Sequence, residues 1–279
     1  MACDHGHKDK VVIIHGRAAA MEVPGQFGPQ FEDALRFGLK RVGYEAWRCV
    51  PVEVPFYGEL WRPDQYLPVP DFDPGVRNEG KGIPTIGDAA EWAIEFADQF
   101  GILSGGILEL MLRDVKEYFT LEAVREATDA IVLDAIGDAE VVTFVGFSMG
   151  SLVGYHILSV KQPPAVRYFV TCGSPIGSRR FYKYVRDLSV NRQPRFPDRL
   201  MMWANIWDDR DTATKVFDLT RLFPSTVPGR VVQSARSYGR PPARTNPFTA
   251  HNASDYLSSK SLGAAVMSAL RAGSPPATD

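Results

Sequence analysis

The chain has 279 residues, of which 45% are hydrophobic, and a formal net charge of −2 at pH 7. Apolar segments recur evenly and no long linker separates them, so we expect one domain over residues 1–279. The near-neutral charge argues against nucleic-acid binding, and the arginines between residues 179 and 199 are interspersed with acids, as on a solvated surface.

The cysteines and the chain start bear on the compartment. Cys3, Cys49 and Cys172 are too few and too scattered for a disulfide framework, which favours a reducing cytosol. No signal-peptide core opens the sequence and no apolar run is long enough to span a bilayer, with signal-less export as the alternative. Residues 1–9 are expected to form a flexible tail. Its Cys3-Asp4-His5-Gly6-His7 stretch has no second ligand cluster, so we expect no metal site.

The first part of the chain has the pattern of a β-α-β unit. Lys10 to Gly16 is a short apolar run ended by glycine, which is typical of a strand buried on both faces of a parallel sheet. Apolar residues at helical spacing predict a helix over Phe31–Val42, which Gly43 ends. Glu45–Val54 is predicted to return as a strand.

Residues 56–119 are predicted to form an insertion that covers the site. Phe56–Pro84 is rich in Pro, Gly, Trp, Tyr and Asp, and is either a compact loop or a wall over the site. Asp88–Phe119 is expected to be largely helical, interrupted at 101–106. Its apolar stripe favours packing on the sheet over a mobile lid that touches acyl chains. Residues 92–119 are also where peripheral membrane contact is conceivable.

The remaining strands and helices alternate along the chain. This order predicts an α/β fold with a mostly parallel central sheet and helices on both faces. Ligands of such sheets bind beyond the carboxyl ends of the strands. The predicted elements are a helix over Leu121–Ile136, strands over Val141–Val145, Val166–Gly173, Leu200–Trp207 and about Arg230–Gln233, and a closing helix over Leu257–Ala272.

The segment Gly146-Phe147-Ser148-Met149-Gly150 directly follows the strand Val141–Val145 and indicates a nucleophile elbow. In such a turn a serine projects its Oγ out of the sheet, and flanking glycines prevent collisions with the neighbouring strand and helix. The segment after Gly150 has helical apolar spacing and begins with small residues. Ser148 is therefore the candidate nucleophile.

A serine nucleophile needs a base and a carboxylate that orients the base. Of the five histidines, two belong to the expected tail. His15 ends the first strand, where a structural hydrogen bond is its expected role, and His156 lies two turns into the helix after the elbow and points away from Oγ. His251, in a polar stretch before the closing helix, is therefore the candidate general base. The alternative is a capping or surface histidine.

The acid is expected after a strand between Ser148 and His251. Asp208-Asp209-Arg210-Asp211 directly follows the strand that ends at Trp207. We choose Asp211, which is deepest in the loop, with Asp208 as second choice. An ordinary acidic loop is the alternative.

The oxyanion that forms when serine adds to a carbonyl carbon needs two backbone N–H donors. The N–H of Met149, at the start of the elbow helix, is one candidate. The other is the N–H of Arg17, in the loop after the first strand.

Together these segments resemble the α/β-hydrolase superfamily, and within it bacterial serine esterases and lipase-like hydrolases. The resemblance lies in His15-Gly16, the elbow, residues 171–177, the loop 203–211 and residues 251–257, and Phe56-Tyr57-Gly58-Glu59 resembles a Tyr-Gly-acid turn of that group. It implies that Ser148, Asp211 and His251 are nucleophile, acid and base. Phe147 stands where many relatives have histidine, which does not affect the chemistry. Thr212-Ala213 differ from the relatives' usual turn, so the choice between Asp208 and Asp211 stays open.

The expected function is hydrolysis of a carboxylic ester through an acyl-enzyme, with a lipid or other apolar acyl substrate. A thioesterase or amidase on the same triad is one alternative. A catalytically silent hydrolase fold that binds a partner is another. No phosphate loop, metal-ligand spacing or flavin signature accompanies the triad, so we expect no cofactor.

Overall fold

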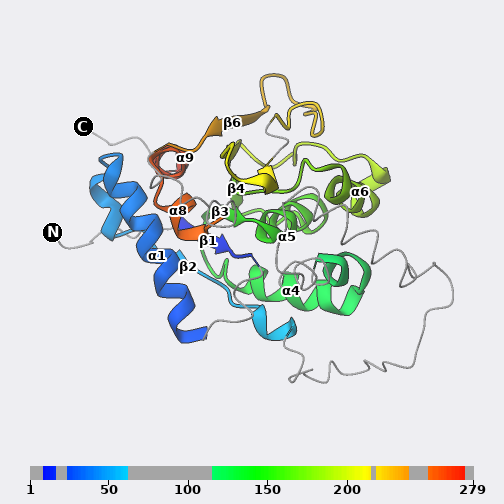
Figure 1. Ribbon diagram of the computed structural model, residues 1–279, viewed down its shortest axis with the longest axis horizontal. Coiled ribbons are helices and arrows are strands. Elements are labelled where there is room, and N and C mark those ends of the chain that lie inside the picture. Colours follow the sequence, from blue (N-terminus) through cyan, green and yellow to red (C-terminus); the bar gives the residue numbers. More distant parts are fainter. Residues whose placement is uncertain (1–8, 17–23, 62–114, 215–217, 239–250, 274–279) are drawn as a thin grey trace.

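A computed structural model describes residues 9–16, 24–61, 115–214, 218–238 and 251–273 (Figure 1). In these ranges six strands form one sheet, in the order β2-β1-β3-β4-β5-β6, and every neighbouring pair is parallel. The strands are β1 (Asp9–Ile14), β2 (Val52–Glu53), β3 (Val141–Phe147), β4 (Val166–Cys172), β5 (Met202–Trp207) and β6 (Val232–Arg236).

The strand order reverses direction at β1. β1 pairs with β2 on one side and with β3 on the other, and every later strand is added on the β3 side. Open parallel sheets bind ligands at such a switch point, beyond the carboxyl ends of the strands. Gly16 follows β1 and Ser148 follows β3, the two neighbouring strands at this switch point.

Helices cover both faces of the sheet (Figure 1). Val12 and Ile14 of β1 belong to the apolar core shared with α4, α5 and α6, whereas Val11 and Ile13 belong to the core shared with α1, α8 and α9. This alternation follows from the two-residue period of a strand. The helices are α1 (Pro24–Arg41), α4 (Glu122–Asp134), α5 (Met149–His156), α6 (Arg179–Leu188), α8 (Ala253–Leu257) and α9 (Lys260–Gly273).

The prediction of a mostly parallel sheet between two helical layers is confirmed. The prediction of a strand over Glu45–Val54 is wrong for most of that segment. Its first part is a 3-10 helix, η2 (Glu45–Arg48), and only β2 is extended. Arg36 of α1 explains the difference, because its guanidinium donates to the carbonyl oxygens of Trp47 and Val50 and so holds the segment in a turn.

Other element boundaries differ from the predictions. α1 begins seven residues before Phe31, in a Gly- and Pro-containing stretch without the apolar spacing on which the prediction relied. β6 lies two to three residues further along the chain than the predicted strand, and its register pairs Arg236 with Trp207. The predicted closing helix corresponds to α9, which begins three residues later than expected, after Ser259, whose hydroxyl accepts the N–H of Leu262; the short helix α8 before it was not predicted.

The predicted cover over residues 56–119 lies mostly outside the described residues. At its ends the structure has a short 3-10 helix, η3 (Gly58–Trp61), and a helical segment over 115–120. Of the helices within the described ranges, none has both the length and the apolar character that crossing a bilayer requires.

The cysteines differ in their bonding, although the sequence predicted no disulfide framework. Cys49 is disulfide-bonded, whereas Cys172 in β4 is a free and buried thiol. The reducing cytosol that the sequence favoured stays a prediction.

Candidate active site

Ser148 occupies the turn between β3 and α5 with φ 52° and ψ −123°. Such backbone strain costs about 1–3 kcal/mol in a residue other than glycine, and persists only where the surroundings enforce it. Here the N–H of Ser148 donates to the carbonyl oxygen of Cys172 over 3.1 Å, and its own carbonyl accepts the N–H of Ser151 over 3.0 Å. These bonds tie the turn to β4 and to α5.

The glycines of the elbow stand where no side chain fits. A Cβ on Gly150 would lie 1.9 Å from the carbonyl oxygen of Ile14 in β1, and one on Gly146 would lie 2.7 Å from the Cα of Ser151. A Cβ on Gly16 would lie 3.0 Å from the Cβ of Ser148. The predicted reason for the flanking glycines is thus confirmed, and the loop after β1 lies directly against the serine.

Ser148, His251 and Asp211 form one hydrogen-bonded chain. His251 Nε2 lies 2.9 Å from Ser148 Oγ, and His251 Nδ1 lies 2.8 Å from Asp211 Oδ2. The three side chains come from the turn after β3, the loop after β5 and the residues just before α8. Asn252 caps α8 by accepting the N–H of Asp255, which fixes the helix start next to the histidine. The structure thus brings together the three residues chosen from the sequence.

Asp211 is fully buried, yet three donors support its charge. Its Oδ1 accepts the N–H of Ala213, and its Oδ2 accepts from His251 and from the Tyr256 hydroxyl. Burial favours the protonated form, but the charge of His251 and these hydrogen bonds outweigh burial and lower the pKa of Asp211. The carboxylate is therefore ionised at neutral pH.

The second-choice acid, Asp208, has a different partner. Its Oδ1 accepts from Arg210 Nε at 2.9 Å, and its Oδ2 accepts from Arg210 Nη2 at 2.7 Å. The same pairing raises the pKa of Arg210. Between the two candidates left open by the sequence, Asp211 is the one that contacts His251.

The candidate oxyanion donors are described only in part. Met149 is the first residue of α5, so its N–H belongs to the helix end that favours negative charge. Arg17 lies outside the described residues, and its role stays a prediction.

His15 makes structural hydrogen bonds at the start of the loop after β1, which is the role expected from the sequence. Its Nδ1 donates to the carbonyl oxygen of Gly16 over 2.7 Å, and its Nε2 accepts the N–H of Tyr57 over 3.3 Å. The two rings stack with centroids 3.8 Å apart, and the Tyr57 hydroxyl donates to the carbonyl oxygen of His15. Burial lowers the pKa of His15 to about 4, although its bond to Gly16 opposes this shift. The imidazole is therefore neutral.

Two site residues were not predicted. Tyr256 donates to the candidate acid, and the ring of Phe147 lies 4.9 Å from that of His251. Phe147 belongs to the elbow, so its proximity to the base could have been expected. Tyr256 stands in the polar stretch before the closing helix, where an isolated aromatic residue gives little signal of its partner.

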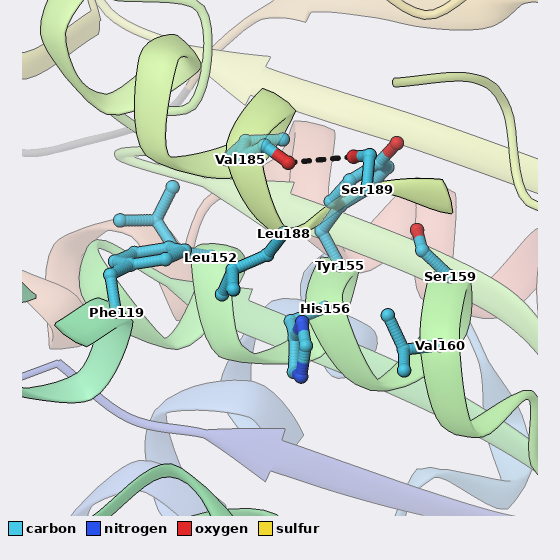
Figure 2. Close-up of a pocket in the computed structure, with 9 residues that line it drawn as sticks. All are labelled: Phe119, Leu152, Tyr155, His156, Ser159, Val160, Val185, Leu188 and Ser189. Carbon is cyan, nitrogen blue, oxygen red and sulfur yellow. Dashed lines mark hydrogen bonds between the residues drawn. The ribbon is translucent and has the colours of Figure 1, made fainter. Parts of the chain in front are cut away.

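His156 lies away from the serine, as predicted. Its Nε2 lies 3.4 Å from Asp129 Oδ2, and Tyr118 donates to the other oxygen of that acid. His156 also lines a small recess between α5 and α6, which has room for about one water molecule (Figure 2). This recess is far too small for a small-molecule substrate, and it lies along the carboxyl-terminal half of α5, so it is not the reaction centre.

The described residues offer no cluster of three or more His, Cys, Asp or Glu side chains that could hold a metal ion. The Cys3-Asp4-His5-Gly6-His7 stretch lies outside them.

The parallel sheet, the strained serine turn and the strand order define an α/β hydrolase. In agreement, the model of the alpha/beta hydrolase fold family matches residues 10–263, and the chain belongs to this family. The predicted superfamily is thereby confirmed. In a comparison with curated protein sequences, none matches the chain.

His15 makes stability depend on pH. Its pKa is 6.5 in the unfolded chain and about 4 in the folded one, so between these values only the unfolded state binds the proton. The free energy of unfolding is highest above pH 6.5 and loses about 3 kcal/mol as the pH falls to 4. We expect His15→Asn, whose amide can still donate to Gly16, to be less stable at pH 7 but to lose about 2–3 kcal/mol less than the wild type on acidification to pH 4.5. Urea unfolding at both pH values measures this, and an unchanged pH dependence would contradict it.

Proposed function

We propose that the protein is a serine hydrolase that cleaves carboxylic esters through an acyl-enzyme. The observation that carries the proposal is the hydrogen-bonded chain from Ser148 Oγ through the His251 ring to Asp211. A serine hydroxyl is a weak nucleophile at neutral pH, and a base within hydrogen-bond reach makes it a competent one. The backbone of Ser148 keeps a strained, positive φ, and residues kept in such conformations cluster at functional sites, which also supports a functional role.

In the first half-reaction, Ser148 Oγ adds to the ester carbonyl carbon while His251 Nε2 takes the hydroxyl proton. Asp211 keeps the other ring nitrogen, Nδ1, protonated, so that Nε2 is free to accept. The carbonyl oxygen becomes an oxyanion that the N–H of Met149 stabilises, and the N–H of Arg17 is the proposed second donor. Collapse of this intermediate breaks the ester C–O bond, and Nε2 gives its proton to the leaving alkoxide.

In the second half-reaction, water attacks the acyl-serine and gives its proton to Nε2. The tetrahedral intermediate then releases the carboxylic acid, and the serine oxygen recovers its proton from His251. The low pKa of Asp211 suits both steps, because an ionised carboxylate stabilises the imidazolium that forms in each.

The proposed substrate is a small-molecule or lipid ester with an apolar acyl group. The Phe147 ring beside His251 supports this choice. A thioester or amide fits the same chemistry, and p-nitrophenyl esters of increasing acyl length, together with matched thioesters and amides, would rank the classes. A catalytically silent scaffold is disfavoured by the intact hydrogen-bonded chain.

We expect Ser148→Ala to lower kcat for ester hydrolysis by roughly 10⁶-fold, because the nucleophile is lost while the fold remains. A fluorophosphonate probe followed by peptide mass spectrometry should label Ser148 in the wild type and nothing in this variant. Ser159→Ala, a serine beyond the carboxyl end of α5, is the matched control and should keep both activity and labelling. Retention of most hydrolysis by Ser148→Ala would reject the proposal.

Substitution of each candidate acid distinguishes the role of Asp211 from that of Asp208. We expect Asp211→Asn to lower kcat by roughly 10⁴-fold, because an amide in place of the carboxylate favours the wrong imidazole tautomer. Asp208→Asn weakens the pairing with Arg210 and should reduce stability, with kcat per folded molecule within about tenfold of wild type. Steady-state kinetics on both variants, corrected for folded fraction, decide the assignment. The reverse order of losses would assign the acid to Asp208.

A further inference from the structure

Tyr256 is held rigidly beneath the candidate active site. It lies in α8, five residues after His251, and its side chain is fully buried. Its ring centroid is 6.0 Å from that of Phe147, and a Cβ added to Gly173 would lie 3.1 Å from its Cε2. The phenol therefore has one well-defined position between the elbow strand and the turn after β4.

The hydroxyl of Tyr256 and the imidazole of His251 share one acceptor atom. Both donate to Asp211 Oδ2, each over 2.8 Å, while Oδ1 is bound by the N–H of Ala213. His251 lies just before α8 and Tyr256 lies within it, so the segment that carries the candidate base is hydrogen-bonded to Asp211 at two points. Loss of the Tyr256 hydroxyl would leave only the imidazole of His251 as a donor to Asp211 Oδ2.

We infer that Tyr256 is a positioning residue for the proposed hydrolysis, whose hydroxyl fixes Asp211 Oδ2 and thereby the ring of His251. This inference rests on the proposed function. It assigns Tyr256 no contact with substrate, since the residue acts through the acid alone.

The hydroxyl also sets how strongly the acid holds the imidazolium. A neutral donor on Oδ2 stabilises the carboxylate charge and weakens its pull on the proton of His251. The nearby charged groups are Asp211 and His251 themselves and, in the same loop as the acid, Arg210 in its pair with Asp208. Without the hydroxyl, Oδ2 attracts the imidazolium more strongly, so the neutral base becomes available only at higher pH.

The test is Tyr256→Phe, which removes one oxygen atom and keeps the ring. We expect kcat to fall roughly 10- to 100-fold with KM within about twofold, because misplacing a base slows chemistry more than binding. The acidic limb of kcat/KM should move upward by about 0.5–1 pH unit. Tyr155→Phe is the matched control. That tyrosine is equally buried, its hydroxyl bonds the backbone of Arg195, and it belongs to the opposite core.

Tyr155→Phe should lose stability but keep the kcat and pH profile of the wild type. A wild-type pH profile and kcat in Tyr256→Phe would overturn the inference, as would equal shifts in both variants. Titration of the His251 ring by NMR in ¹⁵N-histidine-labelled protein gives a readout that needs no turnover. A higher midpoint in Tyr256→Phe alone supports the positioning role even if ester hydrolysis is absent, and an unchanged midpoint overturns it even if hydrolysis is present.

Discussion

The close approach of α5 to β1 is the constraint on which the rest of the site depends. At Gly150 the helix backbone comes so near the carbonyl of Ile14 that even a Cβ would overlap it. The chain can enter the helix from β3 only through a tight turn, and Ser148 takes the positive φ that this turn demands. The serine is thereby fixed at the switch point of the sheet, where the loop after β1 also begins.

Each partner of Ser148 is fixed by its own local structure before it meets the serine. The acid loop is closed by the Ala213 N–H on Asp211 Oδ1 and by the Thr214 hydroxyl on the carbonyl oxygens of Asp208 and Asp211. Asn252 caps the helix that follows His251. Rigid local turns reduce the entropy lost when the three side chains come together, which explains how residues 103 and 40 positions apart form one chain of hydrogen bonds.

Much of this arrangement was predictable, because buried parallel strands and elbows have strong local patterns. The apolar runs of β1, β3 and β4 and the glycines around Ser148 sufficed for the sheet and the candidate nucleophile. The segment after Tyr44 was mispredicted because its turn depends on the guanidinium of Arg36, a contact that spacing does not reveal. Asp208 and Asp211 differ by three positions in one loop, and only the folded backbone decides which faces the base. Tyr256 was missed for the same reason.

The central claim is that Ser148 Oγ attacks a carbonyl whose developing charge faces the start of α5. A crystal structure of the covalent fluorophosphonate adduct tests it most directly. We predict that phosphorus is bonded to Ser148 Oγ, with fluoride lost, and that a phosphonyl oxygen lies about 2.7–3.1 Å from the N–H of Met149 while His251 stays within reach of the serine oxygen. Phosphorus on another residue, or an adduct whose oxygen faces away from α5, would contradict the account.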